Sequence, residues 1–134
     1  MRYEYALEMD YNYIYEKDKH VSKELIKTKI HQNEIIIARD INRNIGWLRY
    51  GYFWDNIPFM NMLYIEEEYR RKGIGTGLVK FWEDEMKMKG YNLVMTSSLA
   101  NEQAQFFFRK LGYNDSGCLL LNNQPLEIIF TKYI

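Results

Sequence analysis

The sequence predicts an α+β fold, an α/β sandwich in which helices cover both faces of a mixed, mostly antiparallel, twisted sheet. In the first half, short alternating or β-branched segments lie between turn residues, which is typical of antiparallel strands. In the second half, a strand, a helix and another strand follow one another over residues 57–95, the pattern of a parallel crossover. The length of 134 residues without a Gly/Ser-rich linker predicts a single domain, residues 1–134.

The first half is expected to be mainly strands. Ser22 can cap one helix over residues 23–30, in which Leu25, Ile26 and Ile30 form an apolar stripe. Residues 10–15 fit neither period and stay ambiguous. Strands are expected at residues 3–9, 34–39, 45–54 and 57–65.

The second half is expected to contain two helices. The first follows Gly73 and reaches Lys89, with Gly90 beyond its end. The second begins at Asn101 and ends at Gly112. Strands are expected at residues 93–95, 113–121 and 126–133.

Composition excludes several classes of function. Lys plus Arg and Asp plus Glu number 18 each, so the formal net charge is 0, which argues against binding to nucleic acid or to an anionic membrane. With one cysteine, Cys118, and two histidines, His20 and His31, no intrachain disulfide can form and no metal site is expected. Neither an apolar span of about 18 residues nor a signal-peptide pattern is present, so a cytoplasmic location is expected.

A glycine-rich segment opens the helix after residues 57–65. Gly73 and Gly75 follow Arg70, Arg71 and Lys72 directly, so free N–H groups, a positive helix end and cationic side chains come together, as in a phosphate or pyrophosphate site. The spacing matches neither the P-loop nor the dinucleotide-binding pattern. The alternative is that these glycines serve only tight helix packing beside a solvated loop.

Two motifs together resemble a known family. The pattern Arg70-x-x-Gly73-x-Gly75 resembles the acyl-CoA pyrophosphate loop, Q/R-x-x-G-x-G/A, of the GNAT superfamily of N-acetyltransferases. The run N-E-Q-A-Q-F-F-F-R-K-L-G-Y at residues 101–113 resembles the other signature of that superfamily, N-x-x-A-x-x-F-Y-x-K-x-G-F. The resemblance covers residues 57–113 well and is weaker before them.

The resemblance implies a site for acetyl-CoA. In the superfamily the fourth and fifth strands splay apart, and the pantetheine arm pairs with the backbone of the fourth strand. Asn101 is implied to contact that arm, although a helix N-cap explains it equally well. The implied cofactor-binding residues are Leu63, Tyr64, Ile65, Arg70, Arg71, Lys72, Gly73, Ile74, Gly75, Thr76, Asn101 and Phe108.

The resemblance also implies direct attack of a primary amine on the thioester. The superfamily places a tyrosine that protonates the leaving thiolate at the position of Phe108, which has no transferable proton. Asn61 and Glu66 are the candidate catalytic residues, although Glu66 to Glu68 also read as a solvated loop. The chain is thus expected to be an N-acetyltransferase, or alternatively an acyl-CoA-binding sensor or module with little turnover.

The acceptor is an amine-bearing small molecule or peptide that the sequence does not identify. Tyr50, Tyr52 and Trp54 share one face of their strand and are candidate acceptor-binding residues, with core packing as the alternative. The helical region at residues 10–33 is short for the superfamily, which suggests an open acceptor cleft or one completed by a second subunit. A homodimer through the closing strands follows from family analogy alone.

Overall fold

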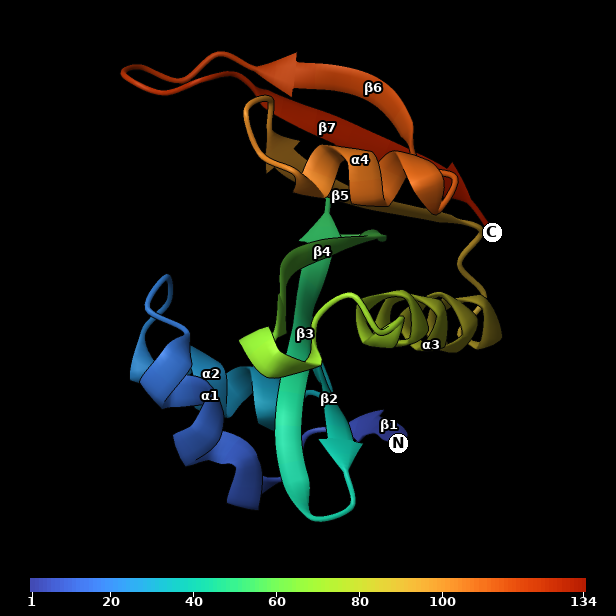
Figure 1. The fold of residues 1–134 in the computed structure, drawn as a ribbon. Helices are drawn as coiled ribbons and strands as arrows, with labels where there is room; N and C mark the ends of the chain where they lie inside the picture. The colour runs from blue at the N-terminus through green and yellow to red at the C-terminus, as the bar shows by residue number, and fades with distance from the viewer. The chain divides into compact units, whose positions relative to one another are not determined.

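The computed structural model describes all residues, 1–134, and confirms an α+β fold with a mixed, mostly antiparallel sheet (Figure 1). The seven strands lie in the order β1-β2-β3-β4-β5-β7-β6. They are β1 (Arg2–Tyr5), β2 (Ile35–Asp40), β3 (Arg43–Phe53), β4 (Ile57–Ile65), β5 (Leu93–Leu99), β6 (Asn114–Leu119) and β7 (Glu127–Tyr133). The helices are α1 (Tyr11–Lys17), α2 (Lys23–His31), α3 (Ile74–Met88) and α4 (Ala104–Lys110), with 3-10 turns η1 (Glu8–Asp10) and η2 (Glu67–Tyr69).

The chain divides into two compact units. The first unit contains Met1–Tyr50 and Met62–Trp82, and the second contains Gly51–Asn61 and Glu83–Ile134. Strands β3 and β4 therefore each contribute residues to both units.

In the first unit, strand alternation separates two apolar faces. Ile35, Ile37 and Trp47 pack with residues of α1 and α2 in one buried cluster. On the other face, the rings of Tyr3 and Tyr5 lie 6.3 and 6.4 Å from that of Phe81 on α3. Because successive strand residues point to opposite faces, helices cover both faces of these strands, as predicted (Figure 1).

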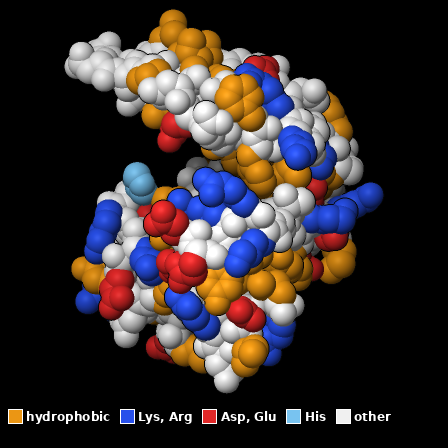
Figure 2. All heavy atoms as spheres, in the orientation of Figure 1, with side chains coloured by type: hydrophobic (Ala, Val, Ile, Leu, Met, Phe, Trp, Pro, Cys, Tyr) orange, Lys and Arg blue, Asp and Glu red, His pale blue; other side chains and the backbone are white.

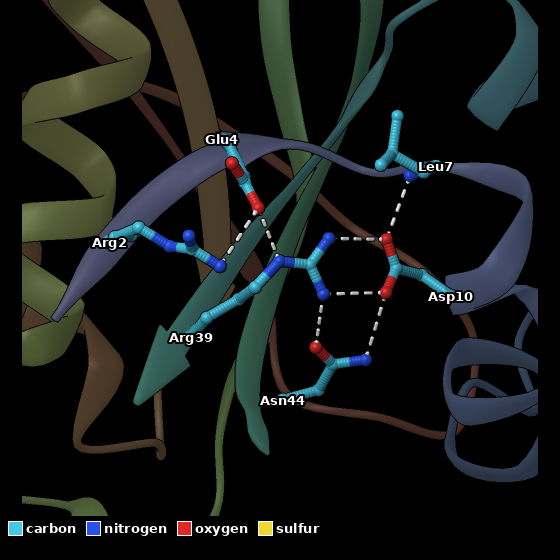
Figure 3. A network of polar contacts seen from close by, with 6 residues as sticks. All are labelled: Arg2, Glu4, Leu7, Asp10, Arg39 and Asn44. Atoms are coloured by element: carbon cyan, nitrogen blue, oxygen red, sulfur yellow. Dashed lines mark hydrogen bonds and ion pairs between the residues drawn. The ribbon is translucent and has the colours of Figure 1, made fainter. Parts of the chain in front are cut away.

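A buried ion pair fixes the start of α1 to the sheet. The guanidinium of Arg39 on β2 donates two hydrogen bonds of 2.7 Å to the carboxylate of Asp10, and both residues are buried (Figure 3). Burial alone would raise the pKa of Asp10, but hydrogen bonds from Arg39, from the Leu7 N–H and from Asn44 outweigh it and hold that pKa below its usual value. The ionised pair thus ties η1 to the β2–β3 hairpin.

The start of the chain differs from the prediction. Strand β1 ends at Tyr5, short of the predicted residue 9, because the chain turns into η1, where the Leu7 N–H donates to the Asp10 carboxylate at 2.8 Å. The ambiguous residues form α1, so two helices, not one, lie between the first two strands. The Ser22 hydroxyl accepts a hydrogen bond from the Leu25 N–H at 3.1 Å, which confirms the predicted cap of α2.

The second unit contains the closing strands. Strand β7 pairs antiparallel with β5 and with β6, and β6 carries a bulge between Asp115 and Gly117. Strand β5 runs from Leu93 to Leu99 and includes residues 93–95, which were expected in a strand. The positive φ values of Gly90, 97°, and Gly112, 93°, agree with the predicted ends of α3 and α4.

Candidate functional site

The loop between β4 and α3 belongs to the first unit and has an unusual backbone. After η2, Arg71 and Gly73 adopt left-handed conformations, with φ values of 61° and 81°. The chain then enters α3 at Ile74, and the first recorded α-helical bond runs from the Gly77 N–H to the Gly73 carbonyl at 3.0 Å. The N–H groups of Ile74, Gly75 and Thr76 belong to the first turn, where an α-helix supplies no backbone acceptor.

The glycines of this segment have different roles. A Cβ built on Gly73 would have no atom within 4 Å, so the space above this backbone is open to a ligand. A Cβ on Gly77 would collide with the Tyr3 hydroxyl and lie 2.6 Å from Tyr3 Cζ. Gly73 therefore fits an anion-binding loop, whereas Gly77 serves the packing of α3 against β1.

The cationic side chains of the loop are exposed. Arg70 is held in place, because its Nε donates to the Ile65 carbonyl at 2.8 Å and its guanidinium lies 5.4 Å from the centre of the Tyr64 ring. Arg71 and Lys72 are exposed beside the first turn of α3. On the face that Figure 2 shows, acidic and basic side chains are interspersed.

Strand β4 leads into this loop and is paired along only part of its length with β5. The parallel pairs that the structure records join Phe59 to Met95 and Met60 to Thr96. The Thr96 hydroxyl donates to the Met60 carbonyl at 2.9 Å and reinforces this pairing. The predicted parallel pair is thus present at Phe59 and Met60, while β4 continues through Leu63 and Tyr64 to Ile65.

Glu66 is enclosed by polar side chains rather than solvated. Its Oε1 accepts a hydrogen bond from the Tyr13 hydroxyl at 2.9 Å and lies 3.0 Å from Lys17 Nζ. Its Oε2 accepts from the Tyr64 hydroxyl at 3.4 Å. Burial and the neighbouring Glu66 raise the pKa of Tyr13, and the hydrogen bond to Glu66 raises the pKa of Lys17. The solvated-loop interpretation is therefore wrong for Glu66, although Glu67 and Glu68 are exposed.

The other catalytic candidate and the implied acid position belong to the second unit. Asn61 is exposed on β4. Phe108 is buried, and its ring lies 5.8 Å from Tyr113 and 5.9 Å from Phe130. The Tyr113 hydroxyl donates to Glu83 at 2.7 Å, and burial with the Glu83 charge raises the pKa of Tyr113. Tyr113 is thus a poor proton donor to replace the absent tyrosine.

Asn101 does not cap a helix. It lies exposed in the turn after β5, and α4 begins only at Ala104, with Gln103 at the N-cap. Glu102 and Gln105 stabilise this turn: the Leu99 N–H donates to Glu102 at 3.1 Å, and Gln105 donates to the Ala100 carbonyl at 2.7 Å. The structure therefore leaves the Asn101 side chain available to a ligand.

Ser98 is a residue that sequence reasoning missed. Its hydroxyl is buried on β5 without a hydrogen-bond partner. Most buried hydroxyls are hydrogen-bonded, so this one is a candidate contact for a bound molecule, but the buried polar atoms of Tyr11, Trp47 and Trp82 also lack a partner and the observation alone does not mark a site. In the sequence, the only signal for Ser98 is its position in the strand before Asn101. Serine is too common a residue for this position to indicate a site.

The acceptor candidates differ in exposure. Tyr50 is fully buried, its ring 5.9 Å from that of Trp82, and its hydroxyl donates to the Asn33 carbonyl at 3.1 Å. In this structure Tyr50 is a core residue. In the second unit, Tyr52 packs 5.7 Å from Tyr91, and Trp54 is 77% exposed in the turn after β3.

The structure contains neither a cluster of metal-binding side chains nor a helix suited to a bilayer. No group of three or more His, Cys, Asp or Glu side chains is placed to hold a metal ion. None of the helices combines the length and the apolar character that crossing a bilayer requires.

Comparison with known proteins supports the fold. Residues 2–113 match the profile of the Acetyltransferase (GNAT) family. The chain is 42% identical to a probable N-acetyltransferase 14 of Xenopus tropicalis over 50 residues. These residues make up 37% of this chain and 24% of that protein. The chain thus spans about a quarter of the length of this curated relative.

Two solved structures share the fold over nearly their whole length. The crystal structure of Ard1 from Thermoplasma volcanium has a TM-score of 0.84 and 12% identity, covering 99% of this chain and 97% of that one. The NatC complex bound to Gag peptide and CoA has a TM-score of 0.81 and 17% identity, covering 99% and 98%. With the family profile matched from the first strand to the end of the second motif, the chain belongs to the acetyltransferase (GNAT) family of acyltransferase enzymes.

Proposed function

We propose that the chain transfers an acetyl group from acetyl-CoA to a primary amine. The observation that carries this proposal is the loop at Arg71 and Gly73, where two left-handed residues precede the first turn of α3 and the space above Gly73 is open. Backbone N–H groups at a helix start favour phosphate, which fits the pyrophosphate of CoA. The NatC structure named above contains CoA and a peptide, which supports the same ligand and a peptide or other amine as acceptor.

The binding role is divided among the residues of this loop and of β4. The N–H groups of residues 71–76 would hold the pyrophosphate, and Arg71 and Lys72 would add positive charge. Backbone groups of Leu63, Tyr64 and Ile65 would pair with the pantetheine arm as an added strand does. Asn101, which lies in the second unit, stays a candidate cofactor-binding residue on the family resemblance alone.

The reaction itself joins the amine nitrogen to the carbonyl carbon of the thioester. The C–S bond then breaks, the nitrogen loses a proton, and the CoA thiolate takes up a proton. A thiolate is a tolerable leaving group, since free thiols have a pKa of about 8.5. Phe108 therefore does not forbid turnover, and solvent serves as the acid. Asn61 can orient a water or the acceptor, while Glu66 is occupied by its own hydrogen bonds and is a weaker candidate for the base.

Two measurements test the proposal. Calorimetric titration with CoA is expected to show binding to the natural chain and no binding to Gly73→Val. Gly90→Ala is the control and is expected to bind CoA normally, because Gly90 has a similar left-handed φ but lies outside the loop. Release of free thiol from acetyl-CoA is then followed with a panel of amines. Unchanged CoA affinity in Gly73→Val would contradict the assignment of the loop.

A second function is favoured by Phe108. Because a buried phenylalanine stands where the family places an acid, the chain could bind acyl-CoA without turnover. This alternative predicts tight CoA binding together with no thiol release above background for any amine.

The sequence features given above remain the basis for proposing a cytoplasmic location, and the homodimer likewise stays a proposal.

A further inference from the structure

The carboxylate of Glu66 lies in a small cluster formed by Tyr13, Lys17, Tyr64 and Glu66, all in the first unit and here called the Glu66 cluster. The two tyrosine hydroxyls donate to different oxygens of the carboxylate, at 2.9 and 3.4 Å. The N–H of Glu66 donates to the Ile45 carbonyl at 2.8 Å. Backbone and side chain are thus both held in place, and the carboxylate has a fixed position.

The cluster has the chemistry of an ammonium site. Lys17 Nζ lies 3.0 Å from the carboxylate, 5.7 Å from the centre of the Tyr13 ring and 5.9 Å from that of Tyr64. The indole ring of Trp47 packs against both tyrosines, at 5.7 and 4.7 Å, and holds them in place. A carboxylate beside aromatic rings is the combination that recognises alkylammonium groups.

Lys17 is the replaceable member of this cluster. The exposed fraction of its side chain is 34%, whereas that of Glu66 is 13%. Lys17 is the last residue of α1, and a lysine has a long flexible stem that can move its charge into solvent at low cost. After such a movement, the two tyrosine hydroxyls still hold the carboxylate, so the site keeps its shape.

We infer that the Glu66 cluster is a binding subsite for an alkylammonium group of the acceptor, which Lys17 fills in the structure. This inference rests on the proposed function, because it specifies the acceptor of that reaction. An ammonium paired with a carboxylate keeps its proton and is no nucleophile. The ammonium held here is therefore not the reacting one, and the acceptor is a molecule with a second amine, either a diamine or a peptide that carries a lysine.

Binding of n-butylammonium, measured by NMR titration of the full chain without CoA, tests the subsite. Lys17→Met retains the apolar stem and removes the competing charge, so it is expected to bind about tenfold more tightly than the original chain. Lys17→Met combined with Glu66→Gln is expected to lose this gain. The matched control is Lys23→Met, which removes an exposed lysine over the Tyr15 ring and is expected to bind as the original chain does. The neutral probe 1-pentanol is expected not to bind.

Three results would overturn the inference: no gain in Lys17→Met, equal binding by the double variant, or equal binding of 1-pentanol. Should the double variant not fold, the ring resonances of Tyr13 and Tyr64 in Lys17→Met decide the matter. Shifts of these rings on titration support the subsite, and their absence contradicts it. With acetyl-CoA present, 1,4-diaminobutane is expected to exceed n-butylamine in kcat/KM about tenfold, a preference that Glu66→Gln removes. Failure of CoA binding would instead refute the proposed function and leave the ammonium result standing.

Discussion

The ring of Tyr3 on β1 lies directly against Gly77 on α3, so that a Cβ on Gly77 would lie 2.6 Å from Tyr3 Cζ. Gly77→Ala is therefore expected to lower the free energy of unfolding by about 1–3 kcal/mol through overpacking. Chemical denaturation measures this change. Tyr3→Leu in the same chain is expected to recover much of the loss, and an unchanged midpoint in Gly77→Ala would contradict the contact.

A substitution of Gly73 is expected to affect ligand binding more than stability. Because its Cβ position is open but its φ is +81°, Gly73→Ala costs only about 1–2 kcal/mol of backbone strain. Its main effect is expected on CoA affinity, which should fall at least tenfold as the backbone leaves its left-handed conformation. Calorimetry at a temperature where both proteins are folded separates the two effects, and a pure stability loss with normal affinity would remove Gly73 from the site.

The ion pair of Asp18 and Arg49 is expected to be a major determinant of stability. Arg49 Nε donates to Asp18 at 2.9 Å, and the two side chains are 6% and 0% exposed. Asp18→Ala leaves a buried guanidinium without its partner and is expected to cost about 3–5 kcal/mol. Asp115→Ala breaks an exposed pair with Arg109 and is expected to cost less than about 1 kcal/mol. Urea denaturation measures both changes, and an equal loss of unfolding free energy in Asp18→Ala and Asp115→Ala would argue against a stabilising role of the buried pair.

Phe108→Tyr tests whether an acid is needed. The new hydroxyl enters a buried aromatic cluster with Tyr113 and Phe130, so stability is expected to fall by about 1–3 kcal/mol. Because a thiolate leaves without assistance, kcat is expected to change by less than about threefold. Thiol release measured from pH 6 to pH 9 gives kcat and its dependence on pH. A tenfold gain in kcat in Phe108→Tyr would mean that protonation of the thiolate by solvent limits the rate of the natural chain.

Stability is expected to fall in alkaline solution, partly because of Tyr113. Burial and the Glu83 charge raise the pKa of Tyr113 above its usual value of about 10 in the folded state. The neutral tyrosine therefore favours the folded state fully below pH 10, and this contribution is lost as pH rises above 10, where only the unfolded chain ionises. Each such group contributes a slope of about 1.4 kcal/mol per pH unit. Chemical denaturation at pH 9, 10 and 11 measures this effect. Above pH 10, the free energy of unfolding of Tyr113→Phe is expected to fall with pH less steeply than that of the natural chain, by about this slope.

Local patterns in the sequence predicted most of the secondary structure, because the period of apolar residues and the capping residues act over a few positions. They failed at α1, whose Tyr-Asn-Tyr-Ile-Tyr start has low helix propensity. Long-range pairs hold this helix instead, since Asp10 is bound by Arg39, 29 positions away, and Asp18 by Arg49, 31 positions away. No periodicity reports such contacts.

The candidate site was predicted in part for the same reason. The glycine loop depends on neighbouring residues, so its motif was visible, and its left-handed Gly73 agrees with it. The surroundings of Glu66 depend on Tyr13, 53 positions earlier, and a run of three glutamates gave no sign of it. Likewise, the burial of Tyr50 could not be separated from that of Tyr52 by strand alternation, which assigns both to one face.

The bulge in β6 bears on how two copies of the chain could associate. Strand β6 is last in the strand order and exposed along its length, so one of its edges has no neighbouring strand in the sheet. The shift in register between Asp115 and Gly117 interrupts the regular series of hydrogen-bonding groups that a continuous intermolecular sheet would need. The bulge therefore disfavours regular extension of the sheet by a second copy, and exposed side chains such as Leu120, between β6 and β7, are alternative contacts for the proposed dimer.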